Sequence, residues 1–164
     1  MISPAKPMSM DHSENKILRM AYARDASIYR LLPESVSRPK NIAEITLLLK
    51  NARLSKTPIT FRAGGTSLSG QSLGNGKIVE ILNYWQKFKI LENGKSIKMQ
   101  PGLNAAFANK ILEPYCRKIG PDPASIKSAC IGGIISNNSS GMVCGTKYNS
   151  YHTLKDLELS LIHI

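Results

Sequence analysis

The sequence is poor in acidic residues and cysteine, and it has no long apolar run. It carries 22 Lys and Arg against 11 Asp and Glu, which gives a formal net charge of +11 over 164 residues. No apolar run reaches the roughly 18 residues that a membrane helix needs. The first ten residues lack the apolar core of a signal peptide. We therefore predict no membrane span in this chain.

The scarcity of cysteine argues against a metal centre. Cys116, Cys130 and Cys144 form no CxxC pair, and no histidine has metal-ligand spacing relative to them. We interpret them as small thiols in or near the core. Free thiols fit a reducing compartment, so we expect a cytoplasmic location. A peripheral association of a longer protein with the inner face of the membrane stays open.

The excess positive charge raises the question of nucleic acid. The basic residues are spread singly from Lys6 to Lys155, and Arg117-Lys118 is the one adjacent pair. No basic stretch is interleaved with several aromatic residues. This scatter is typical of a solvated surface, so we predict no nucleic-acid partner. The alternative is a basic nucleic-acid-binding module whose glycine loops contact backbone phosphates.

The order of elements predicts an α+β fold with a partly parallel sheet. We expect a loose tail over 1–12, then a helix over 13–22 capped by Ser13 and a strand over 35–38. The next helix is capped by Asn41 and has Glu44 in its first turn, and its buried face carries Ile42, Ile45, Leu48, Leu49 and Ala52. A strand over 58–61 follows, then a hairpin turning at Asn93-Gly94 and a helix capped by Asn104 that Pro114 kinks or divides. Residues 13–164 would form one domain. The run 157–164 alternates apolar and polar residues without a closing turn, so we expect the amino-terminal part of a longer protein.

The most informative segment is the run from Arg62 to Gln71, which follows a strand-like segment directly. Its glycines permit positive φ, so successive N–H groups can converge on an anion, and Thr66, Ser67 and Ser69 add hydroxyl donors. Arg62 could add a charge-assisted bond. An ordinary surface turn is the alternative interpretation. The length of the run favours a loop that holds a phosphate.

A second glycine-rich region spans 120–141. Its first part, Gly120 to Ser125, holds two prolines and predicts a stiff loop. Gly132-Gly133 would let the backbone approach a flat ligand or another strand, and the Asn/Ser run from 136 to 140 supplies uncharged donors. Tight loop packing remains the alternative. Other phosphate signatures fail, because Gly76-Lys77 is followed by Ile78 and Val79 stands where a dinucleotide fingerprint needs glycine.

The two regions together resemble FAD-linked oxidases of the vanillyl-alcohol oxidase and para-cresol methylhydroxylase type. The likeness to the D-lactate and D-2-hydroxy-acid dehydrogenase branch rests on the following segments: Arg62 to Gln71, Tyr29-Arg30-Leu31-Leu32-Pro33, Arg38-Pro39-Lys40, Gln100-Pro101-Gly102 and Gly120-Pro121-Asp122-Pro123-Ala124-Ser125. Within that branch, Ser140 to Lys147 and Asn149-Ser150-Tyr151 look most like long bacterial proteins that join this flavin domain to carboxy-terminal iron–sulfur segments.

The resemblance implies a two-part FAD-binding domain of the PCMH type, with a small parallel sheet and helices followed by the start of a larger mixed sheet. By it, the pyrophosphate lies on the first loop, near Gln71, and the isoalloxazine and ribityl groups lie against the second region. The implied cofactor-binding residues are Arg62, Gly64, Gly65, Thr66, Ser67, Leu68, Ser69, Gln71, Pro121, Asp122, Gly132, Gly133, Asn138, Ser140 and Gly141. Covalent relatives have histidine at the position of Thr66, and some have cysteine at Gly120-Pro121-Asp122. We therefore expect non-covalent FAD.

The activity implied by the resemblance is oxidation of a D-2-hydroxy acid such as D-lactate to the 2-oxo acid. A flavin accepts the hydride equivalent while a base takes the hydroxyl proton. The resemblance places the substrate residues in a carboxy-terminal substrate domain outside this chain, so no catalytic residue is assigned and the electron acceptor is a further partner. Iron–sulfur clusters would belong to that remainder. A flavoprotein oxidase of another small alcohol or amine is the alternative. His152 is interpreted as a surface residue.

Overall fold

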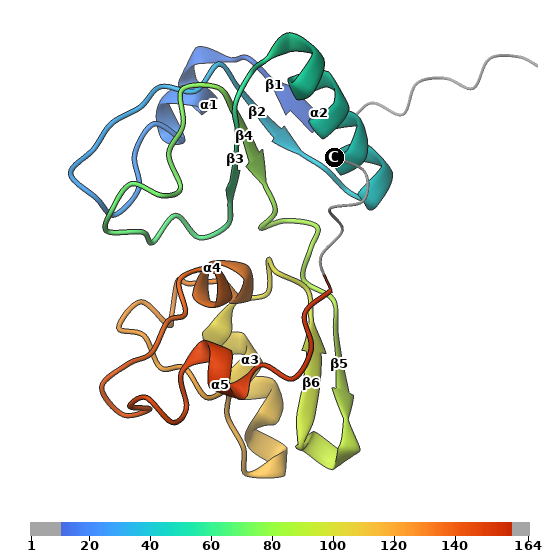
Figure 1. Cartoon of the computed structure of the whole chain (residues 1–164), viewed down its shortest axis with the longest axis vertical. Helices are drawn as coiled ribbons and strands as arrows, with labels where there is room; N and C mark the ends of the chain where they lie inside the picture. The colour runs from blue at the N-terminus through green and yellow to red at the C-terminus, as the bar shows by residue number, and fades with distance from the viewer. Residues whose placement is uncertain (1–10, 159–164) are drawn as a thin grey trace, which may run out of the picture.

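A computed structural model describes residues 11–158, which form two lobes (Figure 1). Residues 81–87, between β4 and β5, join the two lobes and are called the connector below. The first lobe contains β1 (Asp11–Ser13), α1 (Lys16–Ala21), β2 (Ser35–Arg38), α2 (Ile42–Ser55), β3 (Ile59–Arg62) and β4 (Lys77–Glu80). The second contains β5 (Phe88–Leu91), β6 (Ser96–Met99), α3 (Ala105–Leu112), α4 (Ile131–Ser136), α5 (Ser150–Thr153) and 3₁₀ turns at Glu92–Gly94 and Glu113–Tyr115. No helix within residues 11–158 has the length and apolar character to cross a bilayer.

The sheet of the first lobe confirms the partly parallel arrangement. Its order is β1-β2-β4-β3; β4 pairs in parallel with both β2 and β3, and β1 adds an antiparallel edge. β4 therefore lies between β2 and β3 inside the sheet, although it is the last of the four strands in sequence. Ile78 and Val79 in β4 and Val36 in β2 are fully buried, as expected for the middle of a covered sheet.

The helix after β2 begins as the sequence predicts. The Asn41 side chain accepts a hydrogen bond from the backbone N–H of Glu44 at 3.0 Å, which satisfies one of the free donors of the first turn. The buried stripe runs through Glu44, Leu48 and Ala52, spaced four residues apart. Ile42 was expected on this face and instead is 60% exposed, because that stripe leaves it on the solvent side.

The amino-terminal boundary differs from the prediction. Asp11–Ser13 pairs with β2, so Asp11 and His12 belong to the sheet and not to a tail. Because Ser13 ends this strand, it does not cap the following helix. Asn15 does so, accepting hydrogen bonds from the backbone N–H groups of Ile17 and Leu18.

The second lobe confirms the hairpin and corrects the second glycine-rich region. β5 and β6 pair antiparallel, and Asn104 caps α3 by accepting from the N–H of Phe107 at 3.0 Å. Gly132 and Gly133, expected in a loop region where the backbone approaches a flat ligand or another strand, lie in the helix α4. The small core of the lobe is formed by Leu103, Ala105, Ala108, Ala129, Ile131 and Ile134. The predicted strand over 157–164 falls largely outside the described residues, and Leu157 and Glu158 are irregular.

The connector is fixed at both ends. The indole N–H of Trp85 donates to the carbonyl of Pro39 at 2.8 Å, and the Trp85 carbonyl accepts from the N–H of Gly102 at 2.8 Å. Trp85 therefore bonds to the first lobe through its side chain and to the second through its backbone. Such two-sided bonding limits the relative movement of the lobes.

Candidate functional site

The loop between β3 and β4 has the conformation expected of an anion-binding loop. Gly65 and Gly70 have φ of +63° and +74°, values that side chains disfavour. Within residues 11–158, the backbone N–H groups of Gly65, Thr66, Ser67 and Leu68 donate to no protein acceptor. Four consecutive donors are thus left without a protein partner in the described residues, as a loop that binds an anion requires.

Ser67 organises the end of this loop. Its hydroxyl oxygen accepts from the N–H groups of Ser69 and Gln71, both at 3.2 Å, and its hydroxyl donates to the side-chain oxygen of Gln71 at 3.0 Å. The hydrogen bonds of Ser67 therefore stabilise the conformation of this end of the loop. The side chain of Leu68 is 79% exposed and takes no part in this packing.

Arg62 lies beneath the loop. Its guanidinium donates to the carbonyls of Tyr22 at 3.0 Å and Arg24 at 2.8 Å, and its Cζ is 5.1 Å from the centroid of the Tyr22 ring. Burial lowers the pKa of Arg62, opposed by the charge of Asp25. These contacts give Arg62 a supporting role in the first lobe, and its direct contact with phosphate stays a prediction.

Gly64 brings the loop against the second lobe. A Cβ atom at this position would overlap the carbonyl oxygen of Ser128, so only glycine allows the two backbones this close. The Cys130 thiol lies near the backbone of Gly64. Burial raises the pKa of that thiol and outweighs the Gly64 backbone, which acts to lower the pKa, so the thiol is in the neutral form at pH 7. The two glycine-rich regions of the sequence therefore meet here.

A second close contact lies within the second lobe and involves Pro121, Asp122, Ser140 and Gly141. Asp122 and Gly141 are joined by a parallel β-bridge, and the Asp122 N–H donates to the Ser140 carbonyl at 2.8 Å. Gly141 has φ of +147°, and a Cβ there would overlap the Asp122 backbone. Pro121 is buried beside them. The structure thus unites predicted residues that lie about twenty positions apart in the printed sequence.

The remaining predicted residues lie in or after α4, whose ribbon faces the first lobe (Figure 1). The N–H of Gly132 donates to the carbonyl of Pro101 at 2.8 Å, and a Cβ added to Gly132 would lie 2.7 Å from the Pro101 side chain. Gly133 is exposed, with nothing within 4 Å of an added Cβ. Asn138 has φ of +46° and accepts from the N–H of Tyr151 at 3.0 Å. Asn138 thus holds α5, while Gly133 leaves an open backbone surface.

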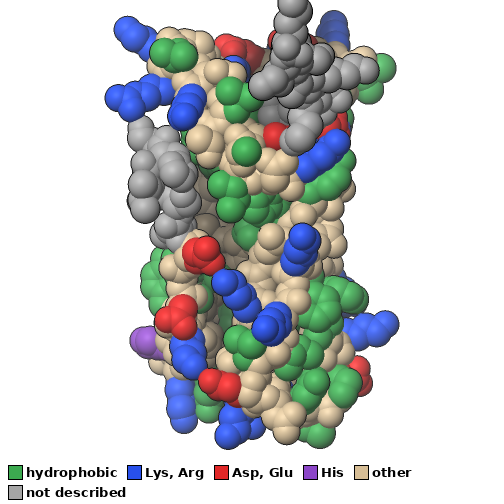
Figure 2. Space-filling view, turned by 90° about the vertical axis from the view of Figure 1, so that its right-hand side faces the viewer, with side chains coloured by type: hydrophobic (Ala, Val, Ile, Leu, Met, Phe, Trp, Pro, Cys, Tyr) green, Lys and Arg blue, Asp and Glu red, His purple; other side chains and the backbone are tan. Residues whose placement is uncertain are grey.

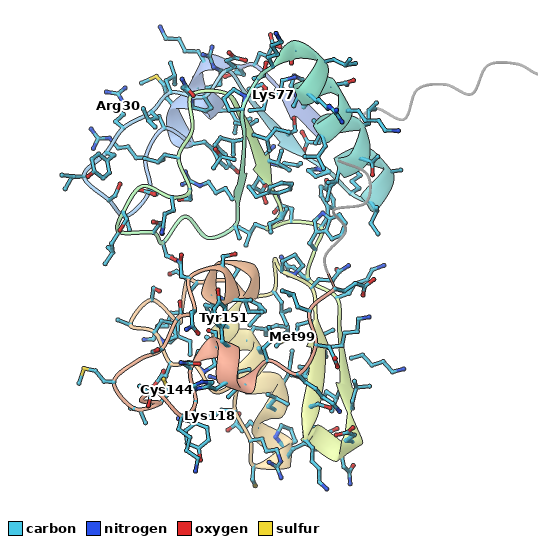
Figure 3. All side chains as sticks on the ribbon, in the orientation of Figure 1. Arg30, Lys77, Met99, Lys118, Cys144 and Tyr151 are labelled. Atoms are coloured by element: carbon cyan, nitrogen blue, oxygen red, sulfur yellow. The ribbon has the colours of Figure 1, made fainter. Side chains whose placement is uncertain are left out.

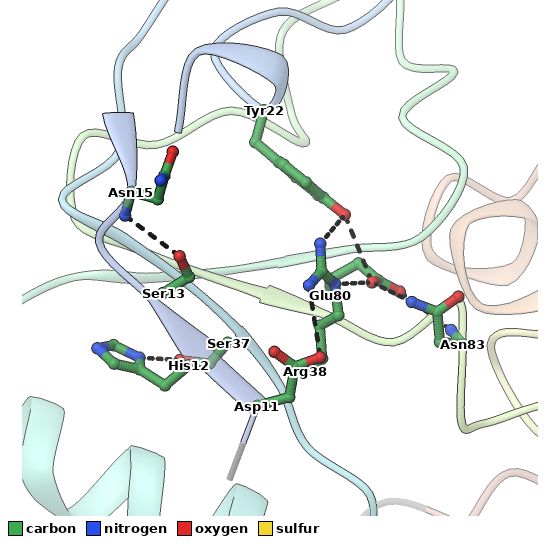
Figure 4. Close-up of polar contacts among 9 residues, drawn as sticks. All are labelled: Asp11, His12, Ser13, Asn15, Tyr22, Ser37, Arg38, Glu80 and Asn83. Carbon is green, nitrogen blue, oxygen red and sulfur yellow. Dashed lines mark hydrogen bonds and ion pairs between the residues drawn. The ribbon is translucent and has the colours of Figure 1, made fainter. Parts of the chain in front are cut away.

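A buried polar network lies behind the loop and was not found from the sequence (Figure 4). Glu80, the last residue of β4, is 2% exposed and accepts from Nε of Arg38 at 2.9 Å. Asn83 of the connector donates to the same carboxylate through its backbone N–H at 3.1 Å and its amide at 3.0 Å. Arg38 donates hydrogen bonds to the Tyr22 hydroxyl and to Glu80, and both raise the pKa of Arg38. Its members are far apart in sequence, so local patterns carry no sign of it.

Two hollows of about 510 and 280 Å³ lie away from these residues, and Lys118 lines both. Figure 3 shows Lys118 and Cys144 near each other in the second lobe. Neither hollow is lined by a predicted cofactor-binding residue. Residues 11–158 also bring together no group of three metal-ligating side chains. On the face shown in Figure 2, the basic side chains are scattered among apolar and acidic ones.

Comparison with known proteins identifies the family. Residues 33–161 match the family described as FAD binding domain. The chain belongs to this family. This FAD-binding domain is 30% identical to D-2-hydroxyglutarate dehydrogenase of Pantoea ananatis over 127 residues, which cover 75% of the chain and 12% of that protein. It is 28% identical to glycolate oxidase subunit GlcD of Escherichia coli K12 over 155 residues, covering 92% of the chain and 30% of that subunit.

Solved structures confirm the fold. The chain superposes on Physcomitrella patens BBE-like 1 wild-type with a TM-score of 0.73 at 15% identity, covering 87% of this chain and 31% of that one. The expected resemblance to FAD-linked oxidases and the two-part PCMH-type fold are both confirmed. This FAD-binding domain spans only 12 to 30% of the length of the two curated relatives above.

The described residues fit FAD. The pyrophosphate of FAD is an anion, and the loop after β3 offers it four free N–H donors and no acidic side chain. The glycines at 64 and 65 lie where side chains would overlap Ser128 or approach Arg62 to within 2.6 Å. These two glycines therefore let the loop pack closely on Ser128 and Arg62, which fixes the position of its N–H donors.

Proposed function

We propose that this chain is the FAD-binding part of a flavin-dependent oxidoreductase that converts a D-2-hydroxy acid to the 2-oxo acid. The observation that carries the proposal is the run of free N–H groups from Gly65 to Leu68, placed where the two lobes touch. Relatives named D-2-hydroxyglutarate dehydrogenase, glycolate oxidase subunit and D-lactate dehydrogenase support a hydroxy acid as substrate class. D-lactate is the default within that class.

In this proposal the first lobe binds the pyrophosphate through backbone donors. Their fixed orientation comes from the Ser67 hydrogen bonds and from the positive φ of Gly65. The second region supplies Pro121, Asp122 and Gly141 as one surface and Gly132 and Gly133 as another for the rest of the cofactor. When bound, FAD supplies the hydride-accepting chemistry that no side chain of this chain provides.

The described residues give no candidate for the base that takes the hydroxyl proton. His152 is exposed, and its Nδ1 lies 2.7 Å from the Thr146 carbonyl, which makes it part of a surface turn. We place the base, the carboxylate-binding cations, the electron acceptor and any iron–sulfur cluster in other parts of the longer protein. We propose a cytoplasmic location, with peripheral membrane association as a property of the whole protein.

Ligand competition tests the pyrophosphate assignment. The purified chain is titrated with FAD by fluorescence polarisation and then challenged with ADP, AMP and riboflavin. We expect ADP to displace FAD best of the three, because it presents a pyrophosphate to the backbone donors, whereas riboflavin presents none. Equal competition by riboflavin and ADP would argue against the loop as the pyrophosphate site. Salt-sensitive retention on DNA with no FAD binding would favour the nucleic-acid alternative.

Denaturation tests whether FAD is bound without a covalent link. Thr66 stands where covalent relatives have histidine, and its hydroxyl is a poor nucleophile at neutral pH. We expect acid precipitation of the FAD-loaded chain to leave all of the flavin absorbance in the supernatant. Flavin absorbance that remains with the pelleted, washed polypeptide would contradict this prediction.

A further inference from the structure

The segment Arg24–Tyr29 lies against the glycine loop, and no part of the predicted site includes it. Ala26 donates its N–H to the carbonyl of Gly65 at 3.2 Å. A Cβ at Gly70 would lie 2.9 Å from the Tyr29 ring, so the loop packs against this ring at Gly70. The segment thus contacts the loop at both of its positive-φ glycines.

Asp25 joins this segment to the returning part of the loop. Its Oδ2 accepts from the Ser72 hydroxyl at 2.9 Å, and its Oδ1 accepts from the Ser27 N–H at 2.9 Å. Both carboxylate oxygens are therefore used, one to shape its own turn and one to hold the loop. Burial acts to raise the pKa of Asp25, but the hydrogen bonds from Ser27 and Ser72 and the charge of Arg62 outweigh it and lower the pKa.

We infer that Asp25 is a positioning residue for the anion-binding loop, acting through Ser72, with Arg62 as the supporting cation. The inference rests on the proposed function, because its purpose is to keep the N–H groups of Gly65 to Leu68 oriented before the ligand arrives. Pre-oriented donors lower the ordering cost of binding. Arg62 fixes the carbonyls of Tyr22 and Arg24 just before Asp25, and Asp25 then fixes Ser72 just after the loop.

The charge arrangement fits this role. A loop that binds a pyrophosphate gains nothing from a free carboxylate nearby, since like charges repel. Asp25 avoids that conflict because its oxygens are occupied by Ser27 and Ser72 and its charge is offset by Arg62. Ser72 is the residue through which the Asp25 carboxylate holds the loop, so its loss removes this link while the Ala26–Gly65 hydrogen bond stays.

The test compares Ser72→Ala, Ser72→Thr, Asp25→Asn and the control Ser55→Ala. Ser55 has a hydroxyl of similar bonding at the end of α2, with contacts to Ala52 and Thr57 only. We expect Ser72→Ala to weaken FAD binding by about tenfold, the factor that loss of a charge-assisted hydrogen bond produces. Ser72→Thr keeps the hydroxyl and should restore affinity. Asp25→Asn should weaken binding in the same direction, and Asp25→Asn with Ser72→Ala should cost less than the sum of the two.

Hydrogen exchange of the chain without FAD separates this inference from the proposed function. We expect the hydrogen-bonded amides of Ala26, Ser69 and Gln71, which report on the shape of the loop, to exchange faster in Ser72→Ala than in the wild type and in Ser55→Ala, and Ser72→Thr to restore the wild-type rate. Wild-type exchange in Ser72→Ala would overturn the positioning role, whatever the wild type binds. Failure of the wild type to bind FAD, with the exchange difference present, would contradict the proposed function alone.

Discussion

Alanine at position 64 is expected to remove measurable FAD binding at micromolar flavin. The added Cβ would overlap the carbonyl oxygen of Ser128, and neither backbone can move without shifting a lobe. Because the overlap is with backbone and not with a flexible side chain, the loop must lift away from the second lobe. The N–H groups of Gly65 to Leu68 would then move away from the residues of the second lobe that we propose to bind the rest of the cofactor. Fluorescence polarisation with FAD measures the loss.

Gly145→Ala is the matched control. Unlike Gly64, Gly145 has a positive φ, +54°, and nothing lies within 4 Å of an added Cβ. The variant therefore carries the backbone strain of alanine in the left-handed region, about 1–2 kcal/mol, without any overlap. We expect it to bind FAD as the wild type does, with a small loss of thermal stability. If Gly64→Ala bound FAD with wild-type affinity, the close approach of the lobes would have no part in cofactor binding.

The sequence predicts well the elements whose signals are local. The cap formed by Asn41, the hairpin at Asn93-Gly94 and the cap formed by Asn104 all depend on residues within four positions of one another. The glycine loop is found for the same reason, since its composition alone marks it. A run of alternating strands and helices then predicts the parallel pairing, because parallel strands need a crossover between them.

The features that sequence reasoning missed depend on distant contacts. Gly132 and Gly133 disfavour a helix intrinsically, yet α4 forms because Gly132 fits against Pro101 where a side chain would not. Asp25 and Ser72 are 47 positions apart, and Gly64 and Ser128 are further apart still. Neither pair has a local pattern. Asp25 and Ser27 form a local turn, but the contact of this turn with the loop joins residues far apart in the sequence.

The buried pair of Glu80 and Arg38 carries the largest expected effect on stability. Glu80 is 2% exposed and the Arg38 side chain 19%, and the carboxylate also accepts both hydrogen bonds from Asn83. Glu80→Ala would leave the guanidinium with Asp11 at 3.4 Å and the Tyr22 hydroxyl at 3.4 Å, and would leave Asn83 without its acceptor. Removing one partner of a buried pair costs about 3–5 kcal/mol, and we expect a loss of that size in the free energy of unfolding.

Urea denaturation of three variants distinguishes the buried pair from surface charge. Glu92→Ala removes an ion pair with Lys155 whose side chains are 56% and 69% exposed, so we expect a loss of about 1 kcal/mol or less. The double variant Arg38→Met with Glu80→Leu replaces both charges by apolar groups and should recover much of the stability lost in Glu80→Ala, since no buried charge stays unpaired. Equal losses in Glu80→Ala and Glu92→Ala would contradict the burial argument.

Glu80→Ala should also weaken FAD binding. Glu80 ends β4 and Asn83 lies in the connector, so loss of their hydrogen bonds loosens the attachment of the second lobe, an effect that Glu92→Ala lacks.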